Sequence, residues 1–258
     1  MTPLPPPISL VSRRLIAALD MALPGQLQAF YIVGSVALGD YCDGQSDLDF
    51  MAVLAEPADV AALGRVHAEL ALRFPAIDCD GIYLQSGELS RPPQGFGPAA
   101  RGGRVDPASG DERHPVSWLL LADSGIALRG PAPNPPLVAA DRAAAMAYSR
   151  TNLDTYWRNW LARFEQSAGL STHEQLDEAV HWSVLGALRV HRTMTTGRVP
   201  SKSAAGIYGQ SHFSRHAAII DEALRLRCAP TTQSAYAQST DRAADVIDLL
   251  RAVIGPGG

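Results

Sequence analysis

The sequence predicts a two-domain protein in which a small α/β domain, residues 1–132, precedes an all-helical domain, residues 133–258. Short runs of β-branched and aromatic residues, bounded by glycine or proline, are typical of strands and occur only in the first half. After a proline-rich stretch, 132–137, the apolar residues recur only at helical spacing. We therefore expect a small mixed sheet with helices, followed by a helical bundle.

Composition limits the classes of partner. A chain of 258 residues with 47% hydrophobic and 19% charged residues is ordinary for a globular protein. The net charge is -4 and no basic block occurs, which argues against a nucleic-acid partner and favours a cationic small molecule. Without a long apolar run or a signal peptide, no membrane association is expected. We expect a cytoplasmic monomer with reduced cysteines.

The elements of the first domain follow from periodicity and turn residues. We expect helices at 8–23, 56–73 and 115–123, and strands at 29–33, 47–54, 77–84 and 125–131. Residues 85–117 are rich in Gly, Pro, Arg and Ser and have no periodicity. So long a loop is usually functional or disordered, and we expect it to fold over a substrate.

Residues 30–54 contain the main chemical signal. An apolar strand ends at Gly34-Ser35, where free backbone N–H groups can hold phosphate. Asp47 and Asp49 are two residues apart on the next strand, so they share a face. Two adjacent carboxylates repel one another, and a divalent cation removes the conflict. Mg²⁺ is typically held by one or two carboxylates together with substrate phosphates.

The Gly34-Ser35 turn followed by Asp47-Leu48-Asp49 resembles the signature of polymerase-β-type nucleotidyltransferases. The resemblance implies Mg²⁺-dependent transfer of a nucleotidyl group, usually adenylyl from ATP, to an acceptor. Gly34 and Ser35 would then hold the phosphates, and Asp47 and Asp49 the metal.

A third carboxylate is expected on the strand at 77–84. Asp78 and Asp80 share a face there, and Asp80-Gly81-Ile82-Tyr83 resembles the corresponding strand of the aminoglycoside-modifying branch. By that resemblance Asp80 completes the metal site or accepts the proton of the acceptor hydroxyl, with Asp78 as the alternative. The branch commonly has glutamate at this place, so the shorter aspartate is a departure.

The second domain is predicted to consist of helices at 139–164, 173–196, 204–208, 215–227 and 234–254. A helix that carries Arg189 leads through Thr196-Gly197 and Pro200-Ser201-Lys202 into Ala204-Ala205, which resembles the streptomycin/spectinomycin adenylyltransferases. The resemblance implies that Arg189 and Lys202 contact the triphosphate. Lys202 is also the only lysine among 22 basic residues, which suggests that this position needs a compact ammonium.

The acceptor site is less well defined by the sequence. The drug-contacting tryptophan of that family has no counterpart at 85–117, and its acidic contacts match only loosely. The candidate substrate residues are His114, Trp157, Glu174, Asp177 and Glu178.

The sequence thus predicts an adenylyltransferase that uses Mg²⁺ and ATP and acts on a hydroxyl of a small cationic acceptor, with an aminoglycoside as the first candidate. The site is expected between the two domains. Two alternatives remain: transfer to another small molecule or to a protein hydroxyl, and nucleotide binding without turnover.

Overall fold

The computed structural model describes residues 3–167 and 172–255, and the chain forms two compact units, 1–141 and 142–258. The division falls after the proline-rich stretch 132–137, which therefore belongs to the first unit. Each unit has its own cluster of buried apolar residues. An α/β unit followed by a helical unit is the predicted fold class.

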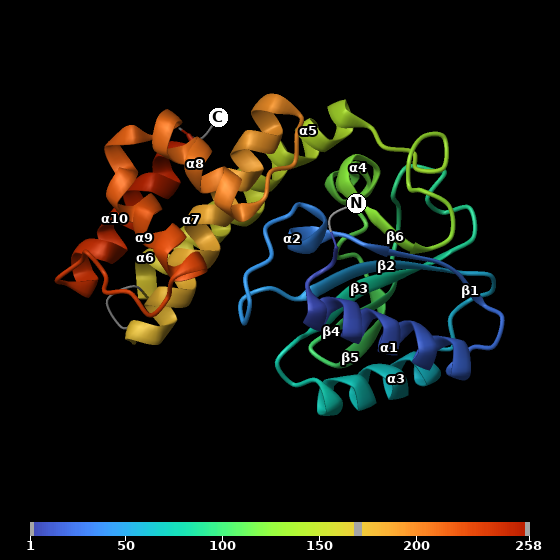
Figure 1. Cartoon of the computed structure of the whole chain (residues 1–258). Helices are drawn as coiled ribbons and strands as arrows, with labels where there is room; N and C mark the ends of the chain where they lie inside the picture. The colour runs from blue at the N-terminus through green and yellow to red at the C-terminus, as the bar shows by residue number, and fades with distance from the viewer. Residues whose placement is uncertain (1–2, 168–171, 256–258) are drawn as a thin grey trace. The chain divides into compact units, whose positions relative to one another are not determined.

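The first unit is built on a six-stranded sheet with the order β5-β4-β3-β2-β1-β6 (Figure 1). Only β2 and β3 pair in parallel, and the other neighbours are antiparallel. The four predicted strands are all present as β1, β2, β3 and β6. The strands are β1 Leu27–Ile32, β2 Leu48–Leu54, β3 Cys79–Gln85, β4 Gly97–Arg101, β5 Arg104–Ser109 and β6 Ile126–Arg129.

Two long helices cover one face of this sheet, and α4 lies on the other face (Figure 1). The helices of the unit are α1 Pro6–Ala22, α2 Gly34–Ala37, α3 Val60–Arg73 and α4 Pro115–Ser124. Apolar residues of α1 and α3 pack against alternate residues of the strands, among them Leu48 and Phe50 of β2. Because side chains alternate along a strand, Asp49 between them points to the opposite face.

The prediction that residues 85–117 form a long loop without regular structure is wrong. This segment contains β4 and β5, which form a hairpin and extend the sheet at its edge. Their sequences gave no signal because β4 is composed largely of Gly, Pro and Ala, and β5 is mostly exposed on both faces. Pairing with β3 at Gly81 and Ile82, rather than local propensity, makes β4 a strand.

The second unit is helical, with α7 at its centre in contact with α5, α8, α9 and α10. The side chain of Thr172 caps α7 in a capping box with Gln175. The predicted helix at 139–164 is divided into α5, a π-helical turn and α6. The elements are α5 Arg142–Asn152, the π-helix Leu153–Trp157, α6 Arg158–Ser167, α7 His173–Thr196, α8 Lys202–His212, the 3₁₀ turn Ser214–His216, α9 Ala217–Cys228 and α10 Ser239–Ile254.

None of the helices in the described part of the chain combines the length and hydropathy that crossing a bilayer requires.

One buried polar pair lies inside the α/β core. The imidazole of His67 on α3 is 1% exposed, and its Nε2 lies 2.6 Å from the hydroxyl of Tyr83. The ring stacks on Phe50 at a centroid distance of 5.8 Å. Burial lowers the pKa of His67 from 6.5 to about 4, so the ring is neutral in the folded protein at neutral pH.

This pair predicts acid sensitivity of the first unit. Between pH 6.5 and about 4 the unfolded chain binds a proton at His67 that the folded chain does not. Stability is therefore retained above pH 6.5 and lost as the pH falls through this window, by roughly 3 kcal/mol at 1.36 kcal/mol per pKa unit. Urea unfolding of the protein and of His67→Gln between pH 7 and 4 measures the difference in slope. Equal slopes for the two proteins would contradict the prediction.

Candidate active site

The predicted site residues of the first unit meet at one end of the sheet. The pairing of the strands brings together the end of β1, the starts of β2 and β3, and the end of β4. Gly34-Ser35 follows β1, and Arg101 is the last residue of β4. Asp49 is the second residue of β2, and Asp80, its pairing partner, is the second residue of β3. The arrangement follows from the sheet register and not from a long loop.

Gly34 is in close contact with the carboxylate of Asp49. The backbone N–H of Val33 donates to the carbonyl of Asp49 at 3.0 Å, which fixes β1 beside β2 at this point. Gly34 has φ +65°, and a Cβ atom at this position would lie 1.8 Å from Oδ2 of Asp49. No side chain fits between them. The absence of a side chain at Gly34 therefore allows the Asp49 carboxylate to lie this close to the backbone.

Ser35 carries an unsatisfied hydroxyl. Its Oγ is buried and has no hydrogen-bond partner among the described residues. Buried polar atoms are nearly always paired, so such an exception suggests a ligand contact. Asp47 stands immediately before β2 and is exposed.

Asp80 lies beside Asp49, because the two are direct partners in the parallel register of β2 and β3. The N–H of Gly102 donates to its Oδ1 at 3.1 Å, and Nε of Arg101 lies 3.6 Å from its Oδ2. Burial, with the charges of Asp47 and Asp78, raises the pKa of Asp80, while Gly102 and Arg101 oppose the rise. A carboxylate with a raised pKa is a better proton acceptor near neutral pH.

Asp78, the alternative third carboxylate, is exposed and stands before β3, where its carbonyl accepts the N–H of Leu48 at 2.8 Å. Asp80 is thus the carboxylate that the sheet register aligns with Asp49.

The donor set of this strand end fits Mg²⁺. In the described part of the chain no three His, Cys, Asp or Glu side chains form a group that holds a metal ion by themselves. Mg²⁺ in nucleotide sites, however, needs only one or two carboxylates, since water and substrate phosphates complete the octahedron. Asp47 and Asp49 supply hard oxygen donors beside a turn with a free hydroxyl, which is the chemistry that this ion prefers.

In the helical unit, basic side chains gather where α7, α8 and α9 meet. Nε of Arg189 donates to the carbonyl of Pro200 at 3.0 Å, and Lys202 begins α8 with its Nζ 5.2 Å from the ring centroid of Trp182. Burial, together with the positive charges of Lys202 and Arg227, lowers the pKa of His181 to about 4. The predicted pair Arg189 and Lys202 thus lies in an electropositive part of its own unit.

The predicted substrate residues lie in different environments. Trp157 is 3% exposed and packs against Gly186, so the structure corrects its assignment as a substrate contact to a core residue. Aromatic residues at helical spacing in a bundle are usually core residues, and Trp157 is one of them. His114 caps α4 by accepting the N–H of Ser117 at 3.3 Å.

The acidic candidates lie on the first turns of α7. Glu174 and Glu178 are exposed there. Asp177 pairs with Arg242 at 2.6 Å, and Arg242 also pairs with the buried Glu222. Asp177 therefore has a structural partner, whereas Glu174 and Glu178 face solvent.

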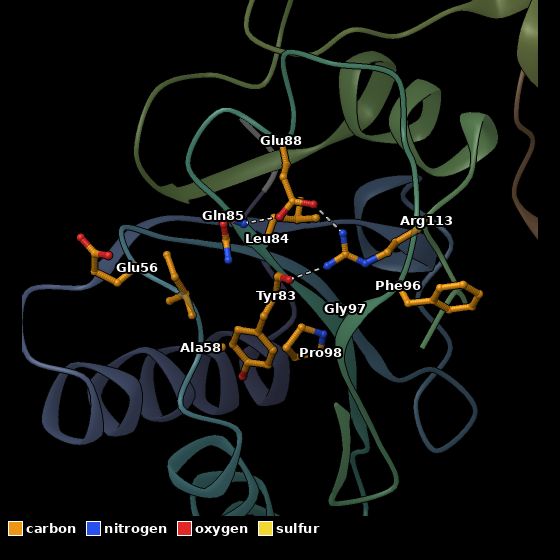
Figure 2. A pocket seen from close by; sticks show the side chains of 11 residues that line it. Glu56, Ala58, Tyr83, Leu84, Gln85, Glu88, Phe96, Gly97, Pro98 and Arg113 are labelled. Atoms are coloured by element: carbon orange, nitrogen blue, oxygen red, sulfur yellow. Dashed lines mark hydrogen bonds and ion pairs between the residues drawn. The ribbon is translucent and has the colours of Figure 1, made fainter. Parts of the chain in front are cut away.

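A separate cavity of about 220 Å³ lies at the other end of β2 and β3 (Figure 2). Leu54 and Gln85, the last residues of these strands, line it, so it contains none of the predicted site residues. The guanidinium of Arg113, which lines the cavity, donates from Nη1 to Oε1 of Glu88 at 2.7 Å and from Nη2 to the carbonyl of Tyr83 at 2.8 Å (Figure 2). These bonds hold the segment that follows β5 against β3 and against the segment that follows β3.

Arg101 and Gly102 are the site residues that the sequence interpretation missed. Both belong to the segment that we expected to be a loop. The signal was the Gly102-Gly103 pair, because two glycines are typical of the tight turn in a two-residue β-hairpin.

The structure is thus an α/β unit with a six-stranded mixed sheet followed by a helical unit. No protein-family profile matches the sequence, and no curated protein sequence matches it. Among solved structures, spectinomycin adenyltransferase AAD(9) from Enterococcus faecialis, determined with ATP and spectinomycin, has a similar fold with a TM-score of 0.64. The similarity covers 94% of this chain and 99% of that chain, at 16% identity.

The contact of Gly34 with Asp49 predicts an unequal cost for two glycine substitutions. Gly34 and Gly39 have φ values of +65° and +67°, but a Cβ at Gly39 meets no atom within 4 Å. Gly39→Ala is expected to cost about 1 kcal/mol from the left-handed backbone alone. Gly34→Ala is expected to cost more, because the Asp49 carboxylate must move. Urea unfolding measures both, and equal costs would contradict the close contact.

Proposed function

We propose that the protein is an adenylyltransferase that transfers AMP from ATP to a hydroxyl of a small cationic acceptor, with an aminoglycoside-type antibiotic as the acceptor class. The observation that carries this proposal is the strand-end geometry of the first unit, where Asp49 contacts Gly34 and is aligned with Asp80. The similar fold of an adenyltransferase determined with ATP and spectinomycin supports the choice of nucleotide and acceptor.

In this proposal Asp47 and Asp49 would hold Mg²⁺, and Asp80 acts beside them as the base. When bound, the ion supplies positive charge to the phosphate oxygens of ATP. The backbone at Gly34 and the hydroxyl of Ser35 contact the phosphates. Ser35 suits this role because its buried Oγ lacks a partner among the described residues.

The transfer step needs a proton acceptor and a stabilised leaving group. The acceptor hydroxyl oxygen attacks the α-phosphorus, its proton passes to the carboxylate of Asp80, and the bond from the α-phosphorus to the pyrophosphate oxygen breaks. Burial raises the pKa of Asp80, which favours its role as the base. Arg189 and Lys202 neutralise the charge that develops on pyrophosphate.

The preference for a cationic acceptor follows from charge. The chain has a net charge of -4, and Glu174 and Glu178 are exposed on α7. We propose these two residues, with Asp177 in a supporting position, as contacts for the ammonium groups of the acceptor. His114 remains a candidate acceptor contact only because it lies beside an acidic side chain. Its Nε2 is 3.8 Å from Oε2 of Glu112.

A pyrophosphate-release assay with ATP and Mg²⁺, run with streptomycin, spectinomycin and other aminoglycosides, tests the proposal. Release is expected only when an acceptor is present, and Asp49→Asn is expected to reduce it to background without lowering the melting temperature, since a repelling charge is removed. Asp43→Asn, an exposed change in the preceding turn, is the matched control and should be silent. Near-full activity in Asp49→Asn would reject the assigned site.

Lys202 gives an independent test of nucleotide binding. A charge-assisted contact to phosphate contributes roughly 1.5–3 kcal/mol, so Lys202→Ala should weaken ATP binding by about one to two decades. Arg198→Ala, a change of an exposed basic residue before α8, is the control and should have little effect.

Because Lys202 is the only lysine, an amine-reactive reagent can label just this side chain and the N-terminus. Protection of Lys202 by Mg²⁺-ATP is expected in peptide mass spectrometry. Equal labelling of Lys202 with and without nucleotide would contradict its assignment as a nucleotide contact.

A further inference from the structure

The hairpin of β4 and β5 places a cation beside the proposed base. Gly102 and Gly103 form its two-residue turn, both with positive φ, and Arg101 pairs with Arg104 across it. A Cβ on Gly103 would lie 2.7 Å from the methyl group of Ala71 on α3, so the turn is packed directly against that helix. Its position next to Asp80 is therefore fixed by packing.

Arg101 bridges two carboxylates. Its Nε lies 3.6 Å from Oδ2 of Asp80, and its Nη1 lies 3.4 Å from Oδ2 of Asp111. The side chain of Arg101 is 65% exposed, and ion pairs of such exposed groups are weak and easily exchanged. The N–H of Gly102 holds the other oxygen of Asp80 at 3.1 Å. Asp80 would thus keep its orientation if Arg101 moved away.

The surroundings of this arginine are acidic. Asp80 is aligned with Asp49 across the parallel pair, and the charges of Asp47 and Asp78 also act on it. A positive group of a ligand that approaches Asp80 therefore competes with the guanidinium of Arg101 for the carboxylates of Asp80 and Asp111. A neutral ligand gains nothing there, because it cannot replace the charge.

We propose, on the basis of the proposed function, that Arg101 occupies the position that an ammonium group of the acceptor takes beside Asp80. Its guanidinium holds the position between Asp80 and Asp111 until an ammonium group of the acceptor displaces it. The displacement brings a cationic acceptor to the proposed base, while Gly102 holds the carboxylate in place.

Spermine tests the cation position without transfer, since it carries ammonium groups but no hydroxyl. By calorimetry, Arg101→Ala is expected to bind spermine about two- to fivefold more tightly than the unchanged protein, the range of an exposed ion pair. Arg104→Ala removes the same charge from the same turn, and Arg104 forms no ion pair with another described residue. It should therefore change the affinity less. Asp111→Asn should weaken binding.

Absence of spermine binding, or equal affinities for Arg101→Ala and Arg104→Ala, would overturn the inference. A kinetic arm uses the acceptor found in the pyrophosphate assay, for which Arg101→Ala should lower KM by a similar factor and leave the KM for ATP unchanged. An unchanged acceptor KM in Arg101→Ala also counts against it. If no acceptor is turned over, the proposed function fails, and the spermine result still decides whether Arg101 holds a cation position.

Discussion

The parallel pairing of β2 with β3 is the constraint on which the candidate site depends. It is the only parallel pair of the described sheet, and it aligns Asp49 with Asp80. A shift of one residue would turn every side chain of β2 to the other face and would move Asp49 into the core that Leu48 and Phe50 occupy. Burial of these apolar residues therefore holds the register, and the register holds the carboxylates together.

The ionised carboxylate of Asp80 lowers the stability of the folded protein. A raised pKa means that the folded protein binds the proton of Asp80 more tightly than the unfolded chain does. The ionised form at neutral pH therefore opposes folding, and the stability is greater below the pKa of the unfolded carboxyl. The apolar core beneath β2 and β3 must offset this cost. Residues kept despite such a cost are typical of functional sites.

The sequence predicted those parts of the fold in which local pattern and burial agree. The strands β1, β2 and β3 are apolar runs that end at turns, and α7 has a cap that can be identified from Thr172 onward. The proximity of Gly34 and Asp49 could be predicted because their spacing on a turn and a strand determines their geometry. β4 and β5 were missed because their composition is poor in strand-forming residues and they become strands only through pairing at the sheet edge.

The same reason explains the errors in the site. Gly102 contacts Asp80 across 22 residues of sequence, and Arg101 contacts the same carboxylate, and no local pattern records either contact. Trp157 was a candidate because spacing alone does not show which of several aromatic residues on a helix faces away from the core. Only the packing against Gly186 distinguishes the two.

The fate of the phosphorus atoms of ATP tests the central claim most directly. The protein is incubated with Mg²⁺, an acceptor from the pyrophosphate assay, and ATP labelled at either the α- or the γ-phosphorus. The account predicts that the α-label becomes attached to the acceptor and the γ-label leaves in pyrophosphate, and that Asp49→Asn abolishes both events. Transfer of the γ-label to the acceptor, or no transfer of either label, would contradict it.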